Sequence, residues 1–158
     1  MKKLLFIGLL LPLVLWAQNE RTDLSTYGIG ATIGTHSELQ IEKMEQRESD
    51  LKTTEVRIYL SNQERIDLIQ LKKPMTIAVT RAQFGKMFSQ KHKGIKLKAL
   101  VRTANEFLIQ RTYDSDGRSI YKFLILRVIK GKEYMIESTE VSDESTCRQM
   151  FDLAKTIR

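Results

Sequence analysis

The chain has 158 residues, of which 42% are hydrophobic and 28% are charged, and it carries 26 Lys and Arg against 19 Asp and Glu. The hydrophobic fraction is too high for an intrinsically disordered chain, and the length suits one domain with a single core. The single Cys excludes a disulfide framework within one chain, and two His leave little material for a histidine-based metal site.

The N-terminus has the three-part layout of a secretory signal peptide. A Met-Lys-Lys start is followed by an apolar run over residues 4–16, and the small residue Ala17 precedes polar sequence. The run is shorter than the roughly 20 residues of a membrane-spanning helix, and neither a twin-arginine pair nor a Cys for lipid attachment is present. We expect residues 1–17 to be removed and residues 18–158 to form one domain. Because secreted eukaryotic domains usually carry disulfides, a periplasmic or secreted bacterial protein fits better.

Alternating patterns predict strands in the first half of the mature chain. Residues 27–33 alternate larger and small side chains, which indicates a strand, and residues 39–41 either continue this strand or pair with it. Residues 55–60 alternate apolar and polar side chains, and residues 65–71 follow after a polar turn. The last two segments are therefore expected to form a hairpin.

A helix is predicted in the middle of the chain. Thr80 is placed to cap its start, Phe84 and Phe88 lie one turn apart, and Gly94 provides a stop directly after Lys93. We expect the helix to run from Thr80 to Lys93, with its aromatic face against a sheet.

The last third predicts further strands and a closing amphipathic helix. The strand-like segments are residues 95–101, 106–111, 120–129 and 133–137. Ser142 or Asp143 caps the final helix, and its apolar face is formed by Cys147, Met150, Phe151, Ala154 and Ile157. These elements predict an α+β fold in which helices pack on an antiparallel β-sheet.

The basic residues are concentrated in one part of the chain. Residues 68–105 contain nine Lys and Arg and no acidic residue. Such a window is typical of a surface that contacts a polyanion, and equally of a solvated helix face or a lysine-protected edge strand that binds nothing. We select the window 72–102 as the candidate site for an anionic partner. Its candidate residues are Lys86, Lys91, Lys93, Lys96, Lys98 and Arg102.

Two glycine-containing segments resemble ligand-binding loops and depart from them. Gly28, Gly30 and Gly34 do not have the spacing of a dinucleotide-binding loop, so we interpret them as sites of close backbone approach. Residues 114–117 (Asp-Ser-Asp-Gly) lack the remaining ligands of a calcium loop, which favours a hairpin turn.

The other reactive residue types give no catalytic pattern. His36 and His92 have no neighbour at metal-ligand spacing, and the helical register of Cys147 indicates a buried thiol, with an intermolecular disulfide as the alternative. We therefore expect no cofactor, no metal and no enzymatic activity. Two carboxylates brought together from distant positions, as in a glycosidase, stay open as a route to catalysis.

The order of elements resembles the PsbP-like superfamily, which is named after an extrinsic subunit of the photosynthetic oxygen-evolving complex. The resemblance covers residues 27–158 and is strongest where the segments 120–129 and 133–137, joined by a Gly-Lys turn, precede the closing helix around residues 151–157. It implies an α-β-α sandwich and an exported binding or accessory protein, and it transfers no functional residue.

These observations predict an exported, non-enzymatic accessory or binding protein. Its partner is expected to be a protein or an anionic component of the envelope, contacted through the window 72–102. Nucleic acid is disfavoured because Phe84 and Phe88 are assigned to the apolar helix face and are not free to stack on bases. The alternative is a periplasmic immunity or inhibitor protein that blocks a toxin or a cell-wall enzyme.

Overall fold

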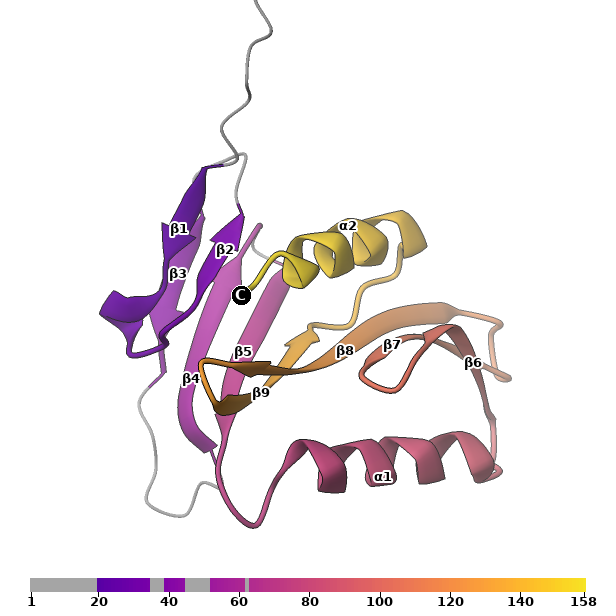
Figure 1. Cartoon of the computed structure of the whole chain (residues 1–158). Helices are drawn as coiled ribbons and strands as arrows, with labels where there is room; N and C mark the ends of the chain where they lie inside the picture. The colour runs from indigo at the N-terminus through magenta and orange to yellow at the C-terminus, as the bar shows by residue number, and fades with distance from the viewer. Residues whose placement is uncertain (1–19, 35–38, 45–51, 62) are drawn as a thin grey trace, which may run out of the picture.

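The computed structural model of the chain describes residues 20–34, 39–44, 52–61 and 63–158 (Figure 1). The expected signal segment 1–17 and His36 lie outside these ranges. Within them, no helix combines the length and apolar character needed to cross a membrane. In chain order the elements are β1 (Arg21–Asp23), a short 3-10 helix η1 (Ser25–Tyr27), β2 (Thr32–Gly34), β3 (Gln40–Lys43), β4 (Lys52–Tyr59), β5 (Arg65–Leu71), α1 (Ile77–Ser89), β6 (Ile95–Arg102), β7 (Glu106–Tyr113), β8 (Ser119–Ile129), β9 (Lys132–Ser138) and α2 (Glu144–Lys155).

Seven of the described strands form one antiparallel sheet in the order β3-β4-β5-β9-β8-β7-β6. β1 and β2 form a separate two-stranded sheet. The predicted α+β class and the predicted β4–β5 hairpin are thereby confirmed, with sheet predominating over helix. The order leaves β3 and β6 at the two edges of the large sheet.

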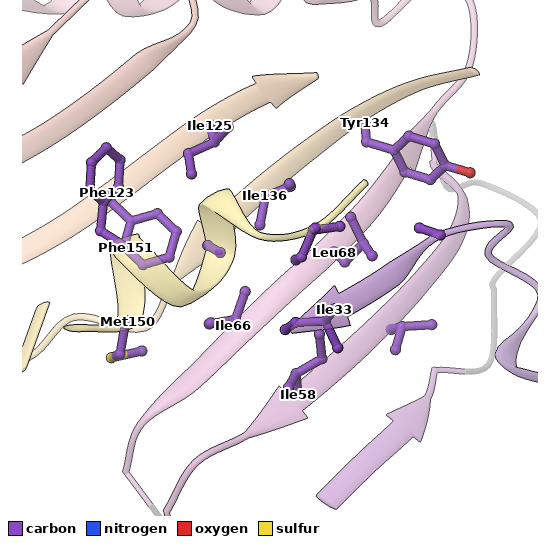
Figure 2. Close-up of a cluster of buried hydrophobic side chains, with 14 of the residues drawn as sticks. Ile33, Ile58, Ile66, Leu68, Phe123, Ile125, Tyr134, Ile136, Met150 and Phe151 are labelled. Carbon is purple, nitrogen blue, oxygen red and sulfur yellow. The ribbon is translucent and has the colours of Figure 1, made fainter. Parts of the chain in front are cut away.

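The two helices cover opposite faces of this sheet. Successive residues of a strand point to opposite faces, and Leu68 belongs to the core with α2 whereas Ile69 belongs to the core with α1. In Figure 1, α2 and the β1–β2 hairpin lie on one side of the sheet and α1 on the other. Figure 2 shows the larger core, where Phe151 of α2 meets Phe123 of β8 edge to face at 5.5 Å.

The closing helix agrees with its prediction. Asp143 is the N-cap, and its carboxylate accepts a hydrogen bond from the Thr146 N–H at 2.6 Å. The predicted apolar face is buried at all five positions: Cys147, Met150, Phe151, Ala154 and Ile157. This face supplies much of the core on its side of the sheet.

The predicted start and end of α1 were wrong. Thr76 caps the helix by accepting from the Val79 N–H at 3.3 Å, whereas Thr80 lies inside the helix and donates its hydroxyl to the Thr76 carbonyl. The helix ends at Ser89, and the Nε2 atom of His92 lies 2.9 Å from the Met87 carbonyl near the helix end. Residues 90–94 therefore form a connection to β6.

The predicted strand over residues 27–33 was also wrong. Asp23 accepts a hydrogen bond from the Ser25 N–H at 2.9 Å at the start of η1, and Gly28 has a φ of 85° at its end. Only Thr32 and Ile33 of the segment belong to a strand, β2. The expected pairing of residues 39–41 also fails, because β3 pairs with β4.

Candidate anion-binding surface

All six candidate basic residues are exposed and lie on or beside the edge strand β6. Lys86 is on α1, Lys91 and Lys93 are in the connection between α1 and β6, and the other three are on β6 itself. We call this set the basic rim: Lys86, Lys91, Lys93, Lys96, Lys98 and Arg102.

The basic rim extends over both faces of β6. Lys96 and Lys98 lie opposite Thr112 and Gln110 of β7, on the face that carries α2. Leu97, between the two lysines, packs with the α1 core on the other face. The rim residues therefore do not form one flat patch but surround an edge of the sheet.

A bulge in β6 places the last rim residue on the α1 side. The register with β7 shifts between Ala99 and Val101, and Arg102 then lies opposite Phe107. The Arg102 guanidinium is 5.1 Å from the centre of the Phe88 ring. This cation-π contact holds a positive charge over the end of α1.

Few carboxylates neutralise the basic rim. Among the described residues its one ion pair joins Lys96 Nζ to Asp114 Oδ1 at 3.4 Å, between side chains that are 81% and 47% exposed. Exposed pairs of this kind contribute about 0–1 kcal/mol and are screened by salt. The rim therefore presents a net positive charge to a partner.

The structure also contains a small apolar cavity that the sequence did not indicate. It has a volume of about 140 Å³ and lies between α1 and the sheet, with Phe84, Met87 and Leu97 in its lining. Arg111 at its border is paired with Glu140 at 2.9 Å. The cavity is lined by residues of α1, β6, β7 and β8, which are far apart in the sequence, so no local sequence pattern reveals it.

A larger hollow of about 410 Å³ near the start of α2 brings three carboxyl groups into one lining: Glu64, Glu140 and Asp143. Glu140 is held by Arg111, and Asp143 caps α2. The hydrogen bond from the Thr146 backbone N–H lowers the pKa of Asp143, whereas a general acid needs a raised pKa. Asp143 therefore lacks the raised pKa that a glycosidase needs in its general acid.

Cys147 of α2 is fully buried in the core, and burial raises its pKa to about 11. A buried neutral thiol is a poor nucleophile, and its position inside the core prevents a disulfide with a second chain unless the core opens.

Residues 114–117 form the β7–β8 turn, with a Gly117 φ of 69°. The described residues contain no group of three or more His, Cys, Asp and Glu that could hold a metal ion.

No protein-family model matches the chain, and a comparison with the curated proteins finds no match.

Proposed function

We propose that the protein is an exported bacterial accessory or binding protein that contacts an anionic partner through the basic rim and carries out no catalysis. The observation that carries this proposal is the position of six exposed basic side chains around one edge strand, with one carboxylate paired to them among the described residues. A concentration of one sign of charge raises the local concentration and the association rate of a partner of the opposite sign.

We also propose that the fold is the α-β-α sandwich of the PsbP-like superfamily. The support is the antiparallel sheet with α1 and α2 on opposite faces, and the β8–β9 hairpin that precedes the closing helix. This assignment agrees with a binding or accessory role.

The packing of the aromatic residues near the rim argues against nucleic acid as the partner. The rings of Phe84 and Phe88 lie 5.7 and 6.3 Å from that of Phe107, which is 3% exposed. Rings engaged in this way are not available to stack on bases. An anionic lipid headgroup, a lipopolysaccharide phosphate or an acidic protein segment fits the surface better.

The proposal is tested by charge reversal with a matched control. We expect the purified protein to bind heparin and phosphatidylglycerol vesicles at low salt, and the variant Lys91→Glu, Lys93→Glu, Lys96→Glu, Lys98→Glu to lose both. The control reverses the same number of exposed lysines away from the rim, directly after β5 and around the β8–β9 turn: Lys72, Lys73, Lys130 and Lys132. Retained binding in the rim variant, or an equal loss in both variants, would overturn a specific role of the rim.

A further inference from the structure

We infer that the free edge of β6 is a docking site for an extended acidic segment of a partner protein, which adds to the sheet as a further strand. The inference rests on the proposed function in one respect, because the basic rim attracts the segment. It goes further in naming the partner as a protein segment with alternating carboxylate and apolar side chains. The main-chain groups of β6, its side chains and its charge each support this.

The main chain of β6 has hydrogen-bonding groups that point away from β7. β6 is at the edge of the seven-stranded sheet, so it has one neighbour strand. Asp114 N donates to the Gly94 carbonyl at 3.0 Å, which makes these two a hydrogen-bonded pair of the antiparallel ladder. Such pairs recur at every second residue, so Leu97 and Ala99 direct their N–H and C=O groups to the free edge. An added strand would bond to these groups.

The side chains of β6 specify which sequence would fit. Residues opposite each other on neighbouring strands share a face and lie about 4.5–5.5 Å apart at Cβ. Opposite Lys96 and Lys98, on the α2 side, the added strand is favoured to carry carboxylate side chains. Leu97 lies with Phe84 and Met87 on the α1 side, so the residue of the added strand between those carboxylates is favoured to be apolar. The fitting segment therefore alternates acidic, apolar and acidic residues.

The charge of β6 disfavours a second copy of the same chain. Two β6 strands paired edge to edge and antiparallel around Leu97 would place Lys96 of one copy opposite Lys98 of the other. Like charges in directly opposite positions destabilise a sheet, and lysines on edge strands prevent self-pairing for this reason. An acidic segment meets the same lysines with attraction.

The bulge limits the length of the docking site. The regular register runs from Ile95 to Ala99 and shifts before Val101. A segment of about five residues covers this stretch, with its main-chain hydrogen bonds centred on Leu97 and Ala99. Asp114 already provides one carboxylate to Lys96, so it competes with the segment from the β7 side.

The test compares two synthetic peptides of equal composition with the purified, isotope-labelled protein. The first has the order Ser-Glu-Val-Glu-Val-Glu-Ser and the second Ser-Glu-Glu-Glu-Val-Val-Ser, so they differ only in alternation. We expect the first to bind about tenfold more tightly. We also expect it to slow amide hydrogen exchange at Leu97 and Ala99 by about tenfold or more, as hydrogen-bonded amides do.

Two variants sharpen the result. Lys96→Glu with Lys98→Glu removes the attraction and is expected to abolish binding of the alternating peptide. Asp114→Asn removes the competing carboxylate and is expected to tighten binding several-fold, while its main-chain bond to Gly94 remains. Both changes affect exposed side chains, so the fold is retained.

The outcomes separate this inference from the proposed function. Equal affinity of the two peptides, or unchanged exchange at Leu97 and Ala99, would overturn strand addition, even if heparin retention still depends on the basic rim. A dimer in the absence of peptide, with these two amides already protected, would overturn it in favour of self-association. Heparin and vesicle binding that is retained in the rim variant, or lost equally in the control, would overturn the proposed function itself, whatever the peptides show.

Discussion

Gly34 and Thr156 are in contact where the end of the chain meets the β1–β2 hairpin. The Gly34 N–H donates to the Thr156 hydroxyl oxygen at 2.9 Å, and a Cβ on Gly34 would lie 3.3 Å from the Cβ and Oγ1 atoms of Thr156. Next to this contact, Thr32 and Arg158 exchange main-chain hydrogen bonds of 2.8 and 3.0 Å. The last residues of the chain therefore hold the N-terminal hairpin to the core.

We predict that this contact stabilises the fold. Thr156→Val removes the acceptor of the Gly34 N–H and is expected to lower the free energy of unfolding by about 1 kcal/mol. Gly34→Ala places a methyl group 3.3 Å from Thr156, whose hydroxyl is held by its hydrogen bond to the Leu153 carbonyl, and is expected to cost about 1 kcal/mol. In contrast, a Cβ on Gly85 in α1 meets nothing within 4 Å, so Gly85→Ala should be stabilising by up to about 1 kcal/mol. Urea denaturation measures all three, and a Gly34→Ala variant as stable as Gly85→Ala would contradict the prediction.

The elements predicted correctly are those whose signals are local. β5 has the predicted bounds, residues 65–71, because its apolar run is bordered by a polar turn and by Lys72. The closing helix combines a capping Asp143 with five apolar residues at helical spacing, and each signal supports the other. When helix propensity, capping and periodicity agree, the structure of such a segment can be predicted from the sequence alone.

The start of α1 depends on a contact that no local pattern contains. Thr76 and Thr80 are both residue types that cap helices, although Thr76 precedes the apolar Ile77 and Thr80 precedes Arg81. In the structure, Glu133 of β9 accepts the Ile77 N–H at 3.0 Å and so satisfies a free donor in the first turn. This tertiary contact, 56 residues apart in sequence, accompanies the start at Thr76.

The basic window was visible in the sequence, but its shape was not. The composition of residues 72–102 identifies the basic residues. Their distribution over two faces follows from the alternation of β6, from its bulge after Ala99 and from its position at the edge of the sheet. Strand order depends on long-range pairing, so the edge position of β6 became apparent only in the fold.

We predict that Asp67 is needed to hold two arginines together in the sheet. Its side chain is 10% exposed, and its Oδ1 atom lies 2.8 Å from Arg65 Nε and 3.7 Å from Arg57 Nε. Asp67→Ala removes the carboxylate shared by two partly exposed guanidinium groups, of which Arg57 keeps Glu55 at 3.4 Å, and is expected to cost about 1–3 kcal/mol.

The matched control for Asp67 breaks an ion pair with more solvent around it. Lys122 Nζ and Glu137 Oε2 are 2.7 Å apart, and their side chains are 39% and 22% exposed. Glu137→Gln is expected to cost less than about 1 kcal/mol because water screens the pair. Denaturant midpoints at constant m-value compare the two variants. Equal losses would show that the partly buried position of Asp67 has no special weight.

We predict that Arg127 stabilises the end of α2. Its Nη1 atom donates to the Lys155 carbonyl at 2.8 Å, which is among the acceptors that a helix end leaves unpaired, and also to the Ile157 carbonyl just beyond the helix. Arg127→Met keeps the apolar stem and removes these bonds, with an expected cost of about 1–3 kcal/mol.

The control for Arg127, which is on β8, is Arg148 on the exposed side of α2. Arg148 pairs with Glu144 at 2.7 Å one turn away, and such surface pairs contribute about 0.3–0.5 kcal/mol. Arg148→Met should therefore change the unfolding free energy little. Amide exchange in the last turn of α2 should accelerate in Arg127→Met and stay unchanged in Arg148→Met. Acceleration in both would indicate general fraying of the helix.

We predict that the burial of Cys147 makes the protein less stable in alkaline solution. Burial raises the pKa of its thiol from 9.0 to about 11, so the native state keeps a proton that the unfolded chain has already lost between these values. The free energy of unfolding therefore falls as the pH rises through this range, by about 1–3 kcal/mol from this group. The Cys147→Ala variant lacks this contribution, so its unfolding free energy should depend less on pH above 9. Thiol titration with a disulfide reagent at about pH 8 gives a second readout: the native protein should react slowly, and the denatured chain at once. Rapid reaction of the native protein, or identical pH dependence of the two proteins, would contradict a protonated thiol held inside the core.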